Sequence, residues 1–184
     1  WLANFHAIFL KIEIDGLWED GCYWHFKTRP DEFDVLEEGQ LKKAAGQLDK
    51  LLSGCKHKTL LHGDAKVANF CFSKNQDKVA AVDFQYVGSG CGMKDLIYLM
   101  SSCLSGAECE KNEAFILESY FNHLKIAINS QKKGIDFMDL KREWSGLYDI
   151  AWSDFLRFLK GWSPGHYKIN GYSEKVLNRT LQKI

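Results

Sequence analysis

The chain has 184 residues, of which 46% are hydrophobic and 14% aromatic, so it can bury a sizeable core and disorder is disfavoured. Its 24 Lys and Arg cancel its 24 Asp and Glu, so no global positive field attracts nucleic acid or an anionic membrane. The sequence has no apolar run near the roughly 20 residues that cross a bilayer, and no signal peptide. These features predict one soluble, cytoplasmic domain over 1–184, with no nucleic-acid or membrane partner.

The six cysteines need no disulfide framework, because a core of this size requires no covalent staples. We expect free thiols in a reducing compartment. Cys71 and Cys103 lie in apolar stretches, which predicts that they are buried, while the other four lie near loop signals. Cys22 and His25 have the spacing of a zinc-ligand pair, but no second pair follows, so a zinc site is disfavoured.

The first predicted element is an amphipathic helix that ends by Gly16. Its apolar residues recur at helical spacing: Leu2, Phe5, Phe9 and Ile12. The aromatic, turn-rich segment 16–30 receives no regular assignment. A second helix is predicted from a cap at Asp31 or Asp34 to about Leu52, with Ser53 and Gly54 ending it. One face of that helix carries Leu41, Ala45, Leu48 and Leu52.

The hydrophobic period then changes to that of short strands. Strands are predicted near 59–61, 69–73 and 79–82, with a polar turn over 74–78 between the last two. The helical period returns afterwards, with helices expected near 94–104, 111–130, 137–160 and 173–183. The pattern predicts a mainly helical α+β fold with one small β hairpin and no internal repeat.

The segment His62-Gly63-Asp64-Ala65-Lys66-Val67-Ala68-Asn69, called the 62–69 loop below, carries the candidate chemistry. It leaves one strand and enters another, and Asp83 ends the strand after that, so the three oxygen-bearing side chains should meet at one edge. A hydroxyl that attacks a phosphoryl group needs a carboxylate to orient it and accept its proton. The nucleotide needs Mg²⁺ held by oxygen ligands.

These requirements assign a role to each residue. We expect Asp64 to be the catalytic base and Lys66 to neutralise charge on the transferring group. Asn69 and Asp83 are the expected ligands of Mg²⁺ bound with ATP.

The spacing H-x-D-x-x-x-x-N followed by Asp83-Phe84 resembles the catalytic loop and metal motif of protein kinases. The HGD form is similar to that of the aminoglycoside phosphotransferase and choline kinase superfamily, and HGDAKVANF with VDFQ is similar to its ecdysteroid-kinase-like members. The resemblance implies the large lobe of a protein-kinase-like fold and transfer of the ATP γ-phosphoryl group to a small-molecule alcohol. It further implies that His62 braces the loop and that Asp95 holds it.

Two differences between this sequence and the protein-kinase motifs favour a small molecule over a protein as the phosphoryl acceptor. Gly63 replaces the Arg that pairs with a phosphorylated activation loop, and Gln85 replaces the Gly after Asp-Phe. No Gly-rich phosphate loop and no VAIK-type lysine precede the 62–69 loop, so we expect the small lobe to be absent from this chain. The 88–92 segment is a poor phosphate cradle, because its glycines do not follow G-x-G-x-x-G.

Other readings stay open. The chain could be a non-catalytic binding or scaffold domain, or a metal-dependent phosphohydrolase with water as nucleophile. Asp95 could simply cap its helix. A helical stripe is expected to be core more than acceptor pocket: Trp144, Tyr148, Trp152, Phe155 and Leu159. Candidate walls of an acceptor pocket are Trp18, Trp24 and Trp162. His57 and His166 should be solvated, while His6 and His123 should be hydrogen-bonded at the core edge.

Overall fold

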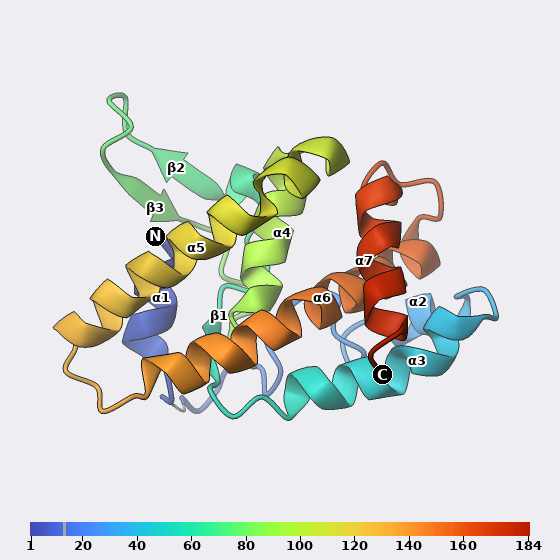
Figure 1. Ribbon diagram of the computed structural model, residues 1–184, viewed down its shortest axis with the longest axis horizontal. Helices are drawn as coiled ribbons and strands as arrows, with labels where there is room; N and C mark the ends of the chain where they lie inside the picture. Colours follow the sequence, from blue (N-terminus) through green and yellow to red (C-terminus); the bar gives the residue numbers. More distant parts are fainter. Residues whose placement is uncertain (13) are drawn as a thin grey trace.

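The computed structural model describes residues 1–12 and 14–184 and shows an α+β, mainly helical chain (Figure 1). The helices are α1 (Leu2–Phe9), α2 (Pro30–Asp34), α3 (Gln40–Ser53), α4 (Met93–Cys103), α5 (Gly106–Ser130), α6 (Phe137–Trp162) and α7 (Gly171–Leu181). The strands are β1 (Thr59–Leu61), β2 (Phe70–Phe72), β3 (Val79–Ala81) and β4 (Gly88–Gly90), with a 3₁₀ turn, η1 (Val67–Asn69), before β2.

Helix α6 lies at the centre of the fold and packs against α2, α3, α4, α5 and α7. It begins at Asp136, whose carboxylate accepts hydrogen bonds from Met138 N (2.9 Å) and Asp139 N (3.1 Å). All residues over 148–159 are buried, as expected for a helix covered on every side. The predicted core stripe is therefore confirmed as packing, since all five of its residues are buried.

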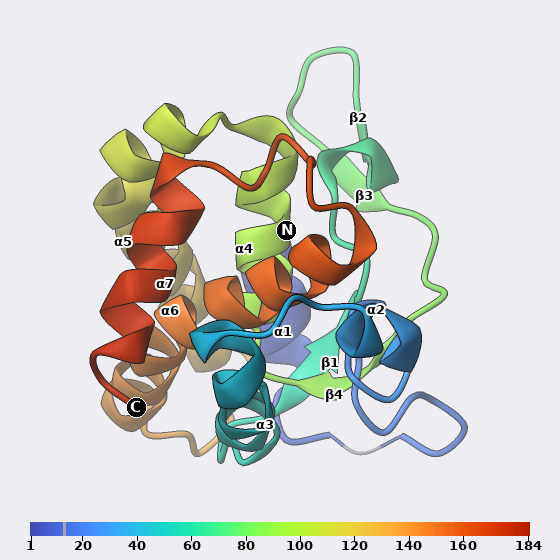
Figure 2. The same ribbon diagram turned by 90° about the vertical axis from the view of Figure 1, so that its right-hand side faces the viewer.

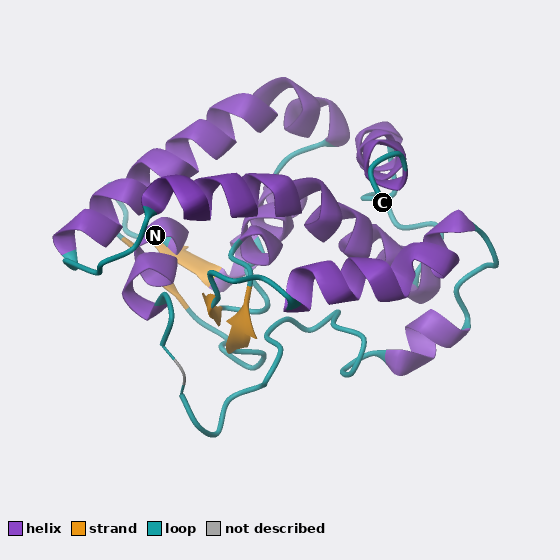
Figure 3. Ribbon diagram, turned by 60° about the horizontal axis from the view of Figure 1, so that its bottom comes forward, coloured by secondary structure: helices purple, strands orange, loops and turns teal. Residues whose placement is uncertain are grey.

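The strands form two separate antiparallel pairs, β1 with β4 and β2 with β3. The hairpin of β2 and β3 stands at one edge of the molecule in Figure 1, whereas β1 and β4 lie side by side near α1 in Figure 2. Figure 3 shows these strands, in orange, against the helical part of the fold. The expectation of a single hairpin is thus incomplete, because Gly88-Ser89-Gly90 has no strand signature and pairs through its backbone alone. Consequently, the 62–69 loop joins two sheets.

Two predicted helix boundaries are wrong. Helix α1 ends at Phe9, and Lys11 adopts a positive φ of 58° while its N–H donates to Lys58 O (2.8 Å), so Ile12 lies outside the helix. The second predicted helix is two helices, interrupted over 35–39, and neither predicted aspartate caps α3. The buried face of α3 nonetheless consists of the four predicted residues, Leu41, Ala45, Leu48 and Leu52.

The predicted burial of several side chains is also wrong. Cys71 and Cys103 are exposed, the other four cysteines are buried, and all six are free. Cys71 lies on the open face of an isolated hairpin, and Cys103 is the last residue of α4. His57 is buried with its Nδ1 2.7 Å from Glu143 Oε2, whereas His123 is exposed. Within the described residues, no helix has the length and apolar character needed to span a membrane.

Candidate active site

The 62–69 loop brings three of the predicted residues into one hydrogen-bonded cluster. Asp64 Oδ2 accepts hydrogen bonds from Lys66 Nζ (2.8 Å) and Asn69 Nδ2 (3.0 Å). Asn69 Nδ2 also donates to the Asp64 carbonyl oxygen (2.8 Å). Because its amide nitrogen is engaged twice, Asn69 has its Oδ1 left to face a cation. Asp64 and Asn69 are nearly buried, with 7% and 6% exposed, so their positions are well defined.

Asp95 fixes the start of this loop from the first turn of α4. Its carboxylate accepts hydrogen bonds from His62 N (2.6 Å) and Gly63 N (3.0 Å), and it lies 3.1 Å from His6 Nε2 on α1. The carboxylate is 1% exposed, and a buried charge of this kind is tolerated only when hydrogen bonds satisfy it. Asp95 therefore ties the loop to two helices.

His62 connects the loop to the strand end that precedes Asp83. Its Nε2 donates to Val82 O (2.9 Å), and its Nδ1 accepts from Asp64 N (3.3 Å), which fits the neutral ring with its proton on Nε2. Val82 N in turn donates to Asn69 O (2.9 Å). The ring of His62 also lies 4.5 Å, centroid to centroid, from that of Phe84. Both ends of the 62–69 loop thus contact the residue before Asp83.

Asp83 itself is exposed and adopts a positive φ of 67°. Its Oδ1 accepts a hydrogen bond from Gln85 Nε2 (2.6 Å), so this contact is made to its own segment rather than to Asp64 or Asn69. The donor set of Asn69 Oδ1 and one carboxylate fits Mg²⁺, which usually takes one or two protein carboxylates and fills its shell with water and phosphate oxygens. Among the residues that the structure describes, no group of three or more His, Cys, Asp or Glu could hold a metal by itself.

Gly63 is the residue whose backbone the site constrains most closely. Its φ is +81°, and a Cβ at this position would overlap the carbonyl oxygen of Tyr86. Its own carbonyl accepts a hydrogen bond from Tyr23 N (3.1 Å). The structure therefore gives a steric reason for glycine here, in addition to the missing regulatory Arg that the sequence indicates.

Three side chains beside Asp64 carry no sequence motif: Tyr23, Tyr98 and Lys168. Lys168 Nζ lies 4.6 Å from the ring centroid of Tyr98, and only 8% of this residue is exposed. Burial lowers the pKa of Lys168 to about 8, an effect that the Asp64 carboxylate opposes and Lys66 reinforces. Burial also raises the pKa of Tyr98, and Asp64 raises it further. Tyr98 lies three residues after Asp95, on the same face of α4, which is the one signal that could have identified it.

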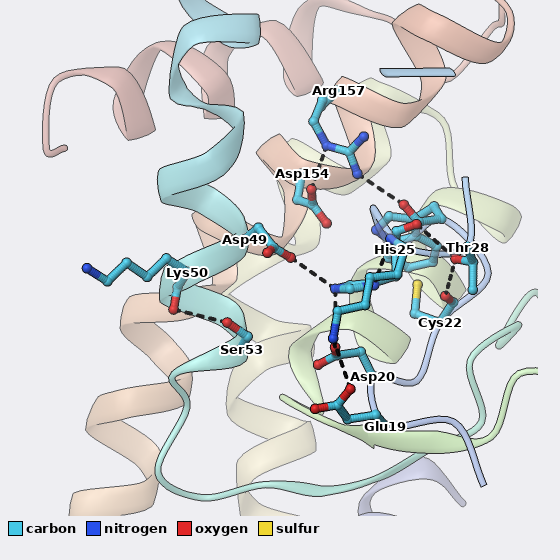
Figure 4. A network of polar contacts seen from close by, with 12 residues as sticks. Glu19, Asp20, Cys22, His25, Thr28, Asp49, Lys50, Ser53, Asp154 and Arg157 are labelled. Carbon is cyan, nitrogen blue, oxygen red and sulfur yellow. Dashed lines mark hydrogen bonds and ion pairs between the residues drawn. The ribbon is translucent and has the colours of Figure 1, made fainter. Parts of the chain in front are cut away.

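A polar network holds the 17–29 segment against α3 and α6 (Figure 4). His25 Nε2 lies 3.0 Å from Asp49 Oδ1 on α3, and Arg157 on α6 donates to Trp24 O (3.0 Å) and to Asp154 Oδ1 (2.8 Å). Since His25 is engaged with Asp49 and Cys22 is a buried free thiol, the structure gives no support to a zinc pair at these two residues.

The predicted tryptophan walls differ in their surroundings. Trp24 is fully buried and packs on the rings of Tyr98 and Phe155, so it belongs to the core and not to an open pocket. Trp18 and Trp162 are each 50% exposed. The indole N–H of Trp18 donates to Gln85 O (3.0 Å), which places Trp18 against the segment that carries Asp83.

A family model described as "Uncharacterized oxidoreductase dhs-27" (DUF1679) matches residues 31–160, that is, 130 of the 184 residues. The matched range contains all six predicted site residues, while Tyr23 and Lys168 lie outside it. No curated protein and no solved structure matches the chain.

Proposed function

The chain belongs to the DUF1679 family, and we propose that it is an ATP-dependent phosphotransferase that moves the γ-phosphoryl group to a hydroxyl of a small molecule. The observation that carries the proposal is the cluster around Asp64. A carboxylate that is nearly buried, bonded to Lys66 and Asn69, lies on a loop fixed by Asp95. The proposal includes the fold, which we interpret as the large lobe of a protein-kinase-like protein.

Asp64 is the proposed base. Its carboxylate orients the acceptor hydroxyl and takes its proton while the hydroxyl oxygen bonds to the γ-phosphorus. The bond from that phosphorus to the ADP oxygen breaks, and ADP leaves with the electron pair. Lys66, whose ammonium lies 2.8 Å from Asp64, balances negative charge at the point of transfer. Mg²⁺, when bound, neutralises the phosphates, and Asn69 and Asp83 would hold it.

His62 and Asp95 are proposed as positioning residues. They hold the loop through Val82 O, His62 N and Gly63 N, and they make no contact that phosphoryl chemistry requires. Phosphoryl transfer depends mostly on position and charge, so a rigid loop serves it directly. This assignment also explains why a buried carboxylate is kept on α4 at a desolvation cost.

The family description names an oxidoreductase, which would need a redox cofactor or a redox-active thiol pair. The groups gathered at Asp64 are a carboxylate, an amide and an ammonium, which serve proton transfer and phosphate binding. A parallel assay of NADH and NADPH oxidation by the same preparation tests whether the chain is an oxidoreductase. Acceptor-independent release of phosphate from ATP would instead favour the phosphohydrolase alternative.

The deciding experiment titrates Mg²⁺ and ATP together into the chain and follows its thermal midpoint. At a ligand concentration about ten times the Kd, binding to the folded state adds about 1.4 kcal/mol, which for a chain of this length raises the midpoint by about 3 to 6 °C. Asp83→Asn should abolish the rise. Asp64→Asn should retain it and, in an enzyme with a competent acceptor, should lower kcat by about 10² to 10⁴-fold.

Asp77→Asn is the matched control, because Asp77 lies on the exposed turn between β2 and β3 and, among the residues that the structure describes, its side chain bonds only to Ser73. It should show the same rise as the parent chain. A parent chain that Mg²⁺ and ATP do not stabilise would contradict a metal and nucleotide site formed by this lobe alone, and the same titration of a longer chain that includes a small lobe would then separate a missing lobe from a non-catalytic scaffold. A rise of equal size in Asp83→Asn would contradict the role of Asp83.

A further inference from the structure

Lys168 also lines a recess that contains no residue of the 62–69 loop. It is a cavity of about 140 Å³ between the end of α4, the starts of α5 and α7, and the side of α6. One water occupies about 30 Å³ of liquid, so the cavity has room for a group of four or five non-hydrogen atoms and not for a whole cofactor. Its walls are largely apolar, with a few polar groups placed among them.

Two helix N-termini meet in this wall. Ser105 and Gly106, at the start of α5, and Asn170, at the start of α7, all line the cavity. They are neighbours, since a Cβ on Gly106 would fall within 3 Å of the Asn170 side chain. The N-terminal ends of helices carry partial positive charge, and here a 25-residue and an 11-residue helix present theirs together.

A first-turn carboxylate neutralises one of these N-termini and not the other. Glu108 lies on the start of α5, where it accepts hydrogen bonds from Ser105 N (2.8 Å) and Ser105 Oγ (2.7 Å), whereas Glu174 of α7 pairs with Lys160 (2.7 Å). Neither glutamate lines the cavity. Lys168 does line it, is 92% buried, and makes its contacts with the faces of Tyr98 and Phe155 rather than with a carboxylate of the described residues.

The wall contains a further donor that lacks a partner. Trp152 lines the cavity, and its Nε1 is buried without a hydrogen-bond partner among the described residues. The Tyr148 hydroxyl on the same helix is already paired with Tyr172 Oη at 2.9 Å. A buried donor without an acceptor costs free energy, and an anionic oxygen in the cavity would accept from Trp152 Nε1 and attract the charge of Lys168.

We propose that this cavity binds an anionic oxygen group, a carboxylate or a phosphate, through Lys168 and Trp152 Nε1, beside the N-terminus of α7. Lys168 lines the cavity and is also close enough to Asp64 for that carboxylate to act on its pKa. If the proposed phosphotransferase function holds, on which this step rests, the cavity receives the anionic end of the acceptor while its hydroxyl reaches Asp64. The substrate class is then a small alcohol that carries a carboxylate or a phosphate.

The test measures binding of inorganic phosphate and of acetate to the chain, without Mg²⁺ and at pH 7, by calorimetry and by the thermal midpoint. One of the two anions should bind saturably, and the preferred one identifies the group. Lys168→Met should weaken that affinity by about tenfold or more, because a hydrogen bond to a charged group is worth more than a neutral one. Trp152→Phe, which removes only the N–H donor, should weaken it less.

Lys175→Met is the matched control, since Lys175 lies on α7, is exposed and pairs with Glu110 of α5 at 2.5 Å without lining the cavity. The Lys175→Met variant should bind the anion with the same affinity as the parent chain. Glycerol 3-phosphate or glycolate should bind in the same Lys168-dependent way, and glycerol should not. Absence of saturable anion binding, or equal affinity in Lys168→Met, would overturn the proposal.

The experiments can disprove either proposal without the other. Asp83→Asn should lose the response to Mg²⁺ and ATP and keep anion binding. Lys168→Met should lose anion binding and keep the response to Mg²⁺ and ATP. Anion binding that depends on Lys168 in a chain that ignores Mg²⁺ and ATP would leave the anion site standing and remove a metal and nucleotide site formed by this lobe alone. The opposite pattern would leave the phosphotransferase standing and remove the anionic acceptor.

Discussion

Gly63 lies between the carboxylate of Asp95, which accepts its N–H, and the carbonyl of Tyr86, which blocks the space of a Cβ. Gly63→Ala should therefore lower the free energy of unfolding by about 3 kcal/mol or more, through backbone strain and overlap together. Urea unfolding measures this change. Gly16→Ala is the control, because Gly16 has a similar φ of +82° and no atom near its Cβ position.

Gly16→Ala should lower the free energy of unfolding by only about 1 kcal/mol, because the left-handed backbone conformation is then the single source of strain. The difference between the two variants isolates the overlap with Tyr86. Equal losses would mean that the loop moves aside easily, and a rigid 62–69 loop would then be a wrong description of the site.

At this scale the sequence predicts best where a motif fixes both residue type and spacing. The motif names Asp64 and Asn69, the chemistry of phosphoryl transfer adds Lys66, and the structure joins the three by hydrogen bonds within one short loop. Lys168 could not be found in this way. Its place over Tyr98 depends on how the segment before α7 docks on α4, which no local pattern records.

Helices α2 and α6 approach each other closely at Gly161. A Cβ at this position would overlap the carbonyl oxygen of Glu32 in α2, which is why the helix end accepts glycine despite its low helix propensity. Gly161→Ala should therefore displace α2 and destabilise the chain by about 1 to 3 kcal/mol. Urea unfolding gives the magnitude, and faster amide exchange over 30–34 would show the displacement.

The same substitution at Gly146 provides the comparison within one helix. No atom lies within 4 Å of its Cβ position, so Gly146→Ala should stabilise the chain by about 0.5 to 1 kcal/mol through helix propensity. If both variants were stabilised, the α2–α6 contact would contribute little to the fold.

The elements themselves were predictable to different degrees. Helices α4 to α7 follow from hydrophobic periodicity and from turn residues between them, which are local signals. Strand β4 has no such signal, because a Gly-Ser-Gly sequence pairs with β1 only after the chain has brought residues 59 and 90 together. The break between α2 and α3 was missed because acidic residues near it look like helix caps.

The whole molecule should lose stability in acid through two partly buried carboxylates. The hydrogen bond from His25 lowers the pKa of Asp49 below its ordinary value of 3.8. Burial raises the pKa of Glu143, but the N–H groups of Lys56 and His57 and the ring of His57 bring it below 4.5. The unfolded chain therefore takes up these protons at a higher pH than the folded chain does.

Their stabilisation should be complete above about pH 5 and should disappear as the pH falls through the lowered folded values. The loss should be on the order of 1 kcal/mol, because both groups are partly exposed and solvent screens them. Urea unfolding at a series of pH values measures it, and Asp49→Asn should flatten part of the profile. A profile that is flat for the parent chain down to pH 3 would contradict the assigned hydrogen bonds.

The residues around the loop fall into two groups by their place in the chain. Those assigned to chemistry lie within 62–95, whereas Tyr23 and Lys168, which contact the same space, come from distant segments. Under the proposed function, mutation and selection can therefore change the ligand by altering the 16–30 and 163–172 segments while the proposed reacting groups stay untouched. A lineage of such proteins would diverge first in ligand choice, and exchange of the 163–172 segment between two members should transfer that choice with the metal requirement unchanged.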